Sequence, residues 1–187
     1  IYNKFKPKND SELKSFNNYL ETIQRQVDDI KNLVNEFSSF ARMPKVNLYS
    51  GDLNKVVSTQ LSLFKTVNKN IEWSYINNLP KNYKMMIDAQ QLRQALTNIF
   101  QNSVDSIYES SSNKKGLINI YTELKKGRVL LIIEDNGPGF PINRESLTNP
   151  YFTLREKGTG LGLSIVSRII EEHNSCLLYT SPSPRDK

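Results

Sequence analysis

Two asparagines and an aspartate share one face of a helix predicted over residues 89–110. Asn98, Asn102 and Asp105 stand at i, i+4 and i+7, so at about 100° per residue they fall within a stripe of about 60°. The residues expected on the opposite face, against a sheet, are Leu92, Leu96, Ile99 and Ile107. Side-chain oxygens on such a stripe suit Mg²⁺, which prefers oxygen ligands and completes its shell with water and substrate phosphates. Taken alone, the same stripe also fits an ordinary solvated surface.

A second chemical group follows a strand predicted over residues 129–135. Asp135 ends this strand and is followed by Gly137 and Gly139 in the segment EDNGPGF. Glycines leave backbone that a ligand can approach closely. The carboxylate beside them can accept a hydrogen bond from an exocyclic amine, such as that of adenine. An ordinary turn formed by Asn-Gly and Pro-Gly is the alternative interpretation.

A third group is a glycine-rich segment that opens a helix predicted over residues 161–173. Its members are Lys157, Gly158, Thr159, Gly160, Leu161 and Gly162. Bare N–H groups at a helix N-terminus favour phosphate, as does the helix dipole. Lys157 adds a positive charge. The spacing differs from the Walker pattern G-x-x-x-x-G-K-[ST], and no strand directly precedes the first glycine, as a Rossmann fingerprint requires.

A long helix is predicted near the N-terminus, over residues 11–42. Its apolar residues recur at alternating spacings of 3 and 4, which makes a heptad seam over four heptads. We expect Asp10 or Ser11 to cap its start and Pro44 to stop it. Such a helix either packs on its own domain or forms half of a helical hairpin in a dimeric bundle. The narrow seam favours the bundle.

Helices and strands alternate after a predicted linker over residues 44–52. The expected helices cover 52–68, 89–110 and 161–173, and the expected strands cover 71–76, 84–88, 118–124 and 129–135. This alternation predicts a two-layer α/β sandwich. Because the strand over 129–135 is continuously apolar, we expect it at the centre of a covered sheet.

The composition argues against several classes of function. The chain has 187 residues and a net charge of +6, but its lysines are scattered and form no basic stripe. We therefore expect no nucleic-acid partner. No apolar run approaches the roughly 18 residues of a membrane span, and we expect no membrane contact in this chain and no secretion leader. The single Cys176 excludes an internal disulfide and fits a cytoplasmic location.

The order and spacing of the three groups resemble the ATP-binding domain of histidine kinases. This domain belongs to the wider GHKL superfamily of gyrase, chaperone, kinase and mismatch-repair ATPases. In that resemblance NIFQN is the N box, DNGPG the G1 box and GTGLGL the G2 box, while NPYFT, which ends at Thr153, stands at the F box. The segment DDIKNLVNEFSSFARMPKVNL is similar to the second helix of the dimerisation and phosphoacceptor hairpin, especially in NtrY-like nitrogen-regulation sensors.

The resemblance implies a fold and a set of roles. The fold would be the α+β Bergerat fold, a mixed sheet covered by helices, preceded by a coiled-coil-type helix. The cofactors would be ATP and Mg²⁺, with Asn102 on Mg²⁺, Asp135 on the adenine amine, and Gly158 to Gly162 around the phosphates. Asn98 occupies the position where hydrolysing members of the superfamily carry a general-base glutamate. An amide cannot take a proton from water, so we expect phosphoryl transfer in preference to hydrolysis.

The implied function is the donor half of a two-component sensor kinase. It would pass the γ-phosphate of ATP to a histidine on a missing helix, for relay to the receiver domain of a response regulator. The parent protein would be a homodimer through the N-terminal helix, anchored in the inner membrane. A GHKL-type ATPase and a non-catalytic nucleotide-sensing dimerisation module are the alternatives.

The chain departs from this family at the phosphoacceptor. No His-Glu-x-x-Asn-Pro box occurs, and the one histidine, His173, matches a structural position at the end of a helix, where the dipole would favour its charged form. We therefore expect ATP binding without autophosphorylation.

Three segments are expected along the chain. Residues 1–45 would be the incomplete hairpin, and residues 46–174 the catalytic domain without its closing strands, which leaves an exposed sheet edge. Residues 175–187 resemble a translated sequencing-adapter junction and are expected to be non-native.

Overall fold

The computed structural model describes residues 9–110, 115–139 and 160–178. It divides into two compact units, one holding the long N-terminal helix and the other beginning at Pro44. Among the described residues, none of the helices combines the length and the apolarity that crossing a bilayer requires.

The first unit contains helix α1 (Asp10–Ala41), which agrees with the helix predicted from the heptad seam. Its cap is Asn9, one residue before the expected Asp10 or Ser11, because the Asn9 side chain accepts a hydrogen bond from the Glu12 N–H at 2.8 Å. The side chains of the seam are between 49% and 60% exposed at Ile23, Val27, Ile30, Val34 and Phe37. An amphipathic helix normally buries its apolar face against a partner, and in α1 this apolar seam is exposed.

The second unit contains all the elements predicted after residue 52. Their bounds are α2 (Leu53–Val67), β2 (Ile71–Asn78), β3 (Met85–Ile87), α3 (Ala89–Glu109), β4 (Gly116–Lys125), β5 (Arg128–Asp135) and α4 (Gly162–Glu172). A further strand, β1 (Tyr49–Gly51), lies within the predicted linker and pairs antiparallel with β3. It is three residues long and mostly exposed. Its sequence therefore lacks the alternation of apolar and polar residues from which a strand is predicted.

The main sheet is mixed, with the strand order β2-β4-β5. β2 runs parallel to β4, and β5 runs antiparallel to β4. The expectation that the strand over 129–135 would be central is wrong, because β4 is the middle strand and β5 pairs with it alone among the described residues. Ile118, Ile120 and Thr122 of β4 are fully buried, whereas Ile132 of β5 is 37% exposed.

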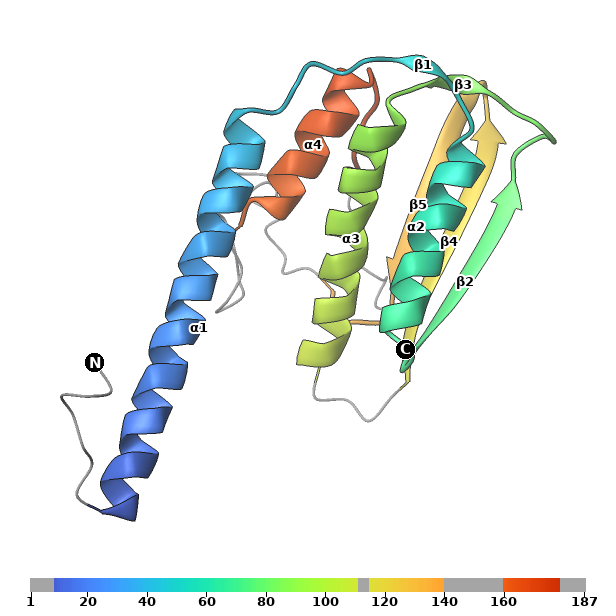
Figure 1. Cartoon of the computed structure of the whole chain (residues 1–187). Coiled ribbons are helices and arrows are strands. Elements are labelled where there is room, and N and C mark those ends of the chain that lie inside the picture. The colour runs from blue at the N-terminus through green and yellow to red at the C-terminus, as the bar shows by residue number, and fades with distance from the viewer. Residues whose placement is uncertain (1–8, 111–114, 140–159, 179–187) are drawn as a thin grey trace. The chain divides into compact units, whose positions relative to one another are not determined.

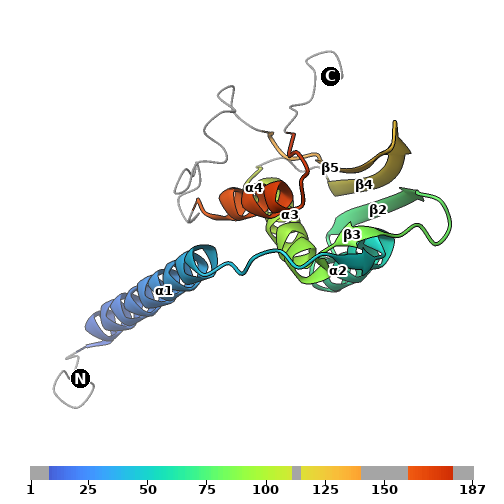
Figure 2. The same cartoon turned by 90° about the horizontal axis from the view of Figure 1, so that it is seen from above.

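The helices form a second layer over one face of this sheet. Figure 1 shows α2 in front of β4 and β5, and α3 lies between α2 and α4, as both Figure 1 and Figure 2 show. The buried stripe of α3 runs along Leu92, Leu96, Phe100 and Val104 at intervals of four residues. Ile99 and Ile107, which were expected on this face, are only half-buried. The two-layer α+β architecture is as predicted.

Three aromatic rings join the two layers in the core. Phe64 of α2, Trp73 of β2 and Phe100 of α3 meet edge to face, with ring centroids 5.3 to 5.9 Å apart. Such pairs contribute about 0.5–1.5 kcal/mol each beyond the area they bury. Phe100 is completely buried, and its backbone lies between Asn98 and Asn102 on the same helix. The packing of the helix that carries the asparagines therefore depends on this ring.

His173 connects the C-terminus of α4 to the start of α3. Its Nε2 lies 3.0 Å from the backbone N of Asp88, and its Nδ1 lies 2.7 Å from the carbonyl oxygen of Ile169. A backbone N–H can only donate and a carbonyl can only accept, so Nε2 stands as the acceptor from Asp88 and Nδ1 as the donor to Ile169. The charge that the helix dipole would favour on this ring stays a prediction.

The segment that enters the second unit is held by the same two helix ends. The backbone N–H of Val46 donates to Glu172 of α4, and that of Asn47 donates to Asp88, the N-cap of α3, each at 3.1 Å. These bonds fix the start of the domain against the helices that carry two of the three chemical groups.

Candidate functional site

The N-box asparagines face the start of α4. The Asn98 side chain donates to the Gly162 carbonyl oxygen at 3.4 Å. A Cβ placed on Gly162 would lie 3.9 Å from Nδ2 of Asn102 and 4.0 Å from the Cβ of Asn98. Two groups that are about sixty residues apart in the sequence are thus brought side by side through the packing of α3 on α4. Both asparagines are half-buried, so the stripe is not an ordinary solvated surface.

The N-terminus of α4 has the properties of an anion site. Its N-cap, Leu161, makes no side-chain capping hydrogen bond, and its first turn carries no acidic residue. Gly160 before it has a φ of +70°, in the left-handed region that favours glycine. The first N–H groups of a helix have no intrahelical partner and attract negative charge. The asparagine carboxamides therefore border a set of backbone donors suited to phosphate.

Asp135 lies at the end of β5 with its side chain fixed by the following turn. Its Oδ1 accepts a hydrogen bond from the Gly137 N–H at 3.0 Å. Gly137 comes so close to the Ser106 hydroxyl of α3 that a Cβ at this position would collide with it. Gly139 has a φ of +78°. Both glycines of the predicted G1 segment are therefore required by the backbone, one by close approach and one by conformation.

Ser106, which was not among the residues predicted from the sequence, extends the polar face of α3 by one more turn. Asn98, Asn102 and Ser106 stand at successive intervals of four residues, with α4 beside the first two and the turn after β5 beside the third. The spacing was visible in the sequence. Serine on a helix is common, however, and only the approach of Gly137 distinguishes this one.

The remaining predicted site residues divide into two sets. Asp105 accepts a hydrogen bond from Gln101 along α3 at 2.7 Å, and its predicted role in binding stays a prediction. The predictions for Thr153, Lys157, Gly158 and Thr159 fall outside the described residues.

Residues 87–186 match the family of histidine kinase-, DNA gyrase B- and HSP90-like ATPases. The chain belongs to this ATPase family. The match begins at the end of β3 and includes α3, β4, β5 and α4, which carry all the described residues of the site. The resemblance inferred from the three motifs is thereby confirmed.

Within this ATPase family, the similar proteins are sensor histidine kinases. The NtrY-like sensor histidine kinase of Rickettsia prowazekii is 36% identical over 164 residues, which cover 87% of this chain and 27% of that protein. The nitrogen regulation protein NtrY of Azorhizobium caulinodans is 38% identical over 161 residues, 84% of this chain and 21% of that protein. The chain thus spans about a quarter of the length of the relatives it matches.

A solved structure supports the same assignment of fold. The catalytic domain of histidine kinase ThkA, in a nucleotide-free form, matches with 27% identity and a TM-score of 0.59, over 67% of this chain and 81% of that one. The family match and the likeness to a histidine kinase catalytic domain therefore agree with each other. Both also agree with the observed fold, a mixed sheet covered by helices.

The donor set for a cation on this ATP-binding domain is sparse. In the part of the chain that the structure describes, His, Cys, Asp and Glu side chains form no group of three that would hold a metal. The Asn102 carboxamide lies beside the start of α4, with its Nδ2 3.9 Å from where a Cβ on Gly162 would stand, and its amide oxygen is the oxygen ligand type that the N-box prediction assigns to a cation. This fits Mg²⁺, which keeps several waters and takes substrate phosphates as ligands, better than ions that need a complete protein cage.

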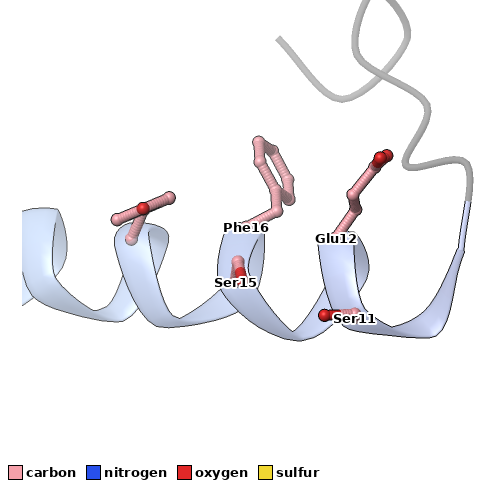
Figure 3. Close-up of a pocket in the computed structure, with 5 residues that line it drawn as sticks. Ser11, Glu12, Ser15 and Phe16 are labelled. Atoms are coloured by element: carbon pink, nitrogen blue, oxygen red, sulfur yellow. The ribbon is translucent and has the colours of Figure 1, made fainter.

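A shallow hollow on α1 is not part of this site. Figure 3 shows it along the first turns of the helix, where it is lined by Ser11, Glu12, Ser15, Phe16 and Tyr19. The Asn9 side chain also donates to the Glu12 carboxylate at 3.5 Å, so Glu12 is engaged in capping the helix. These side chains come from a single helix and include none of the motif residues.

Proposed function

We propose that the chain is the ATP-binding, phosphoryl-donating part of a two-component sensor histidine kinase. The observation that most supports this proposal is the identity of residue 98. It is an asparagine, and its carboxamide donates a hydrogen bond to Gly162 at the start of α4. A carboxylate there would be a base for water, whereas an amide can orient a group but cannot remove its proton. The arrangement therefore favours transfer of the phosphoryl group to another acceptor over hydrolysis.

The proposed binding mode uses the three groups in turn. Asp135 accepts a hydrogen bond from the exocyclic amine of adenine, and the N–H groups at the start of α4, with Gly160 and Gly162, bind the phosphates. Asn102 contributes an oxygen ligand to Mg²⁺, which when bound neutralises developing charge on the phosphates. Transfer then depends on positioning and charge neutralisation, as phosphoryl transfer generally does.

The acceptor and the later partners lie outside this chain. We propose that the phosphoryl group passes to a histidine on a separate hairpin helix and then to the receiver domain of a response regulator. The exposed seam of α1 supports a homodimer, since four heptads of apolar residues suit a helical bundle. Because the relatives are sensor kinases about four times as long, we propose that the parent protein is anchored in the inner membrane, with these parts in the cytoplasm.

The first experiment tests the transfer itself. The chain is mixed with a separate acceptor-helix fragment, Mg²⁺ and labelled ATP, and the label on histidine is followed. Phosphohistidine on the fragment is expected. Steady hydrolysis in the absence of the fragment would instead indicate an ATPase. Tight binding of Mg-ATP with neither reaction would indicate a nucleotide-sensing dimerisation module, the function that the exposed seam of α1 would then favour.

The second experiment tests the role of Asp135. Asp135→Asn should weaken ATP binding by about tenfold or more in a calorimetric titration, because a hydrogen bond to a charged acceptor contributes about 1.5–3 kcal/mol. Glu134→Gln is the matched control, since it removes the adjacent carboxylate of the same strand, opposite Asn119. Equal ATP affinity in the two variants would contradict the assignment.

A further inference from the structure

The side chain of Asn136 replaces part of the backbone ladder between β4 and β5. Its Oδ1 accepts from the Leu117 N–H at 2.8 Å, and its Nδ2 donates to the Lys115 carbonyl oxygen at 2.9 Å. Its backbone N–H donates to the Leu117 carbonyl oxygen at 3.2 Å. One residue thus makes three hydrogen bonds to the start of a neighbouring strand.

The register explains why these three bonds matter. Asp135 pairs with Ile118, so the next rung of the antiparallel ladder would join Asn136 to Leu117 through two backbone bonds. Only one of the two is a backbone bond, because the side-chain oxygen of Asn136 takes the place of its own carbonyl. The Leu117 N–H is satisfied although the chain has left the strand. The backbone of Asn136 is thereby free to turn away from β4.

This turn determines where Gly137 and the Asp135 carboxylate lie at the site. Immediately after it, Gly137 approaches Ser106 of α3 and donates its N–H to Oδ1 of Asp135. Asp135 itself is exposed, so packing alone does not hold its carboxylate. Its direction depends on where the Gly137 N–H lies, and this depends on where β5 ends.

We propose that Asn136 is a positioning residue for recognition of the base: it ends β5 through its side chain and so orients the Asp135 carboxylate toward an exocyclic amine. The inference rests on the proposed function, in which Asp135 accepts from adenine. Asparagine is specifically suited to the position. An aspartate would keep the bond from Leu117 but would present an acceptor to the Lys115 carbonyl, and an alanine would lose both bonds.

The test compares two nucleotides that differ only in the amine. Dissociation constants are measured by calorimetry for ATP and for purine riboside triphosphate, which lacks the exocyclic amine. For the unaltered chain we expect ATP to bind about tenfold more tightly. Asn136→Ala should bring this ratio close to one by weakening ATP, with the affinity for the second nucleotide changed by less than about twofold. Asn136→Asp should give an intermediate ratio, since it keeps one of the two side-chain bonds.

Three controls separate this role from a general structural one. Asn78→Ala removes an exposed amide at the far end of the same sheet and should leave the ratio unchanged. Asp135→Asn should abolish the preference for ATP, and adding Asn136→Ala to it should lower the ratio no further. Thermal melts of each variant show whether the chain is folded, and Asn136→Asp serves if the alanine variant is not.

The outcomes distinguish the inference from the function on which it rests. Equal weakening of both nucleotides in Asn136→Ala would mean a loosened domain and would overturn the inference. So would an unchanged ratio in that variant when Asp135→Asn abolishes the preference. An unchanged ratio in Asp135→Asn would instead overturn the role of Asp135, and the positioning role with it.

Discussion

Replacing Phe100 by leucine should weaken the domain without unfolding it. The ring is completely buried and makes edge-to-face contacts with Phe64 at 5.4 Å and with Trp73 at 5.3 Å between centroids. Losing two such pairs costs about 1–3 kcal/mol. The space left by the smaller side chain adds about 1 kcal/mol. The sum of about 2–4 kcal/mol is a large part of the roughly 5–15 kcal/mol of a typical domain.

Urea unfolding measures this loss directly. Trp73 is the single tryptophan of the chain and belongs to the same cluster, so its fluorescence reports on the packing that the substitution changes. With a slope of about 2 kcal/mol per molar urea, in the middle of the usual range, the midpoint should fall by about 1–2 M. Far-UV circular dichroism provides a second probe that does not depend on the surroundings of the indole.

Tyr108→Leu is the matched control, because it removes an aromatic ring from the same helix at a position that is 56% exposed. Its midpoint should stay within about 0.3 M of the unaltered chain, since surface substitutions usually change stability by less than about 0.5 kcal/mol. A Phe100→Leu midpoint no lower than that of Tyr108→Leu would refute the claim that the aromatic cluster holds α3 on the sheet.

Two further predictions concern the junction between α3 and α4. Burial raises the pKa of Asp88, but hydrogen bonds from the backbone of Gln91, Asn47 and Gln90, with a smaller contribution from the nearby His173, together lower it below its ordinary value. A depressed folded-state pKa gives stability that is present above the unfolded value of about 3.9 and is lost as the pH falls through the folded one. Urea midpoints of the unaltered chain should therefore fall more steeply below about pH 4 than those of Asp88→Asn, and parallel curves would contradict this. His173→Ala should lower stability by about 1–2 kcal/mol in thermal or urea unfolding, because it removes both ring hydrogen bonds. His173→Gln, whose amide oxygen can still accept from the Asp88 N–H, should lose less, and equal losses in the two variants would refute the hydrogen-bonding role of the ring.

Periodicity predicted the helices and strands because it records which face of each element is buried. The heptad seam predicts α1 to within a residue at each end, and the stripe of α3 places Asn98 and Asn102 correctly. Strand order is a different kind of information. β5 is as apolar as a central strand, yet β4 lies in the middle, because the parallel pairing of β2 with β4 is made through a crossover that no local pattern records.

The candidate site shows the same division between local and long-range information. Glycines and a carboxylate at fixed spacing identify Gly137 and Asp135, because their chemistry depends on residue type. Ser106 and Asn136 could not be identified in this way, since their roles arise only when Gly137 meets α3 and when β5 meets the start of β4. The sequence thus identifies the groups that would contact a ligand more readily than the groups that hold them.

The state of His173 bears on where the phosphoryl group can go. Phosphorylation of an imidazole requires a nitrogen lone pair that faces the donor, and in His173 the lone pair of Nε2 is taken by the Asp88 N–H while Nδ1 carries the proton. Exposing Nε2 would break the bond that joins α4 to α3, the two helices on which the proposed ATP site is built, and exposing Nδ1 would break the bond to Ile169 within α4. The one histidine of the chain therefore stabilises the proposed donor site and cannot receive from it in the same conformation. Under the proposed function the acceptor must come from another chain or segment, so His173→Gln should leave transfer to an added acceptor helix intact.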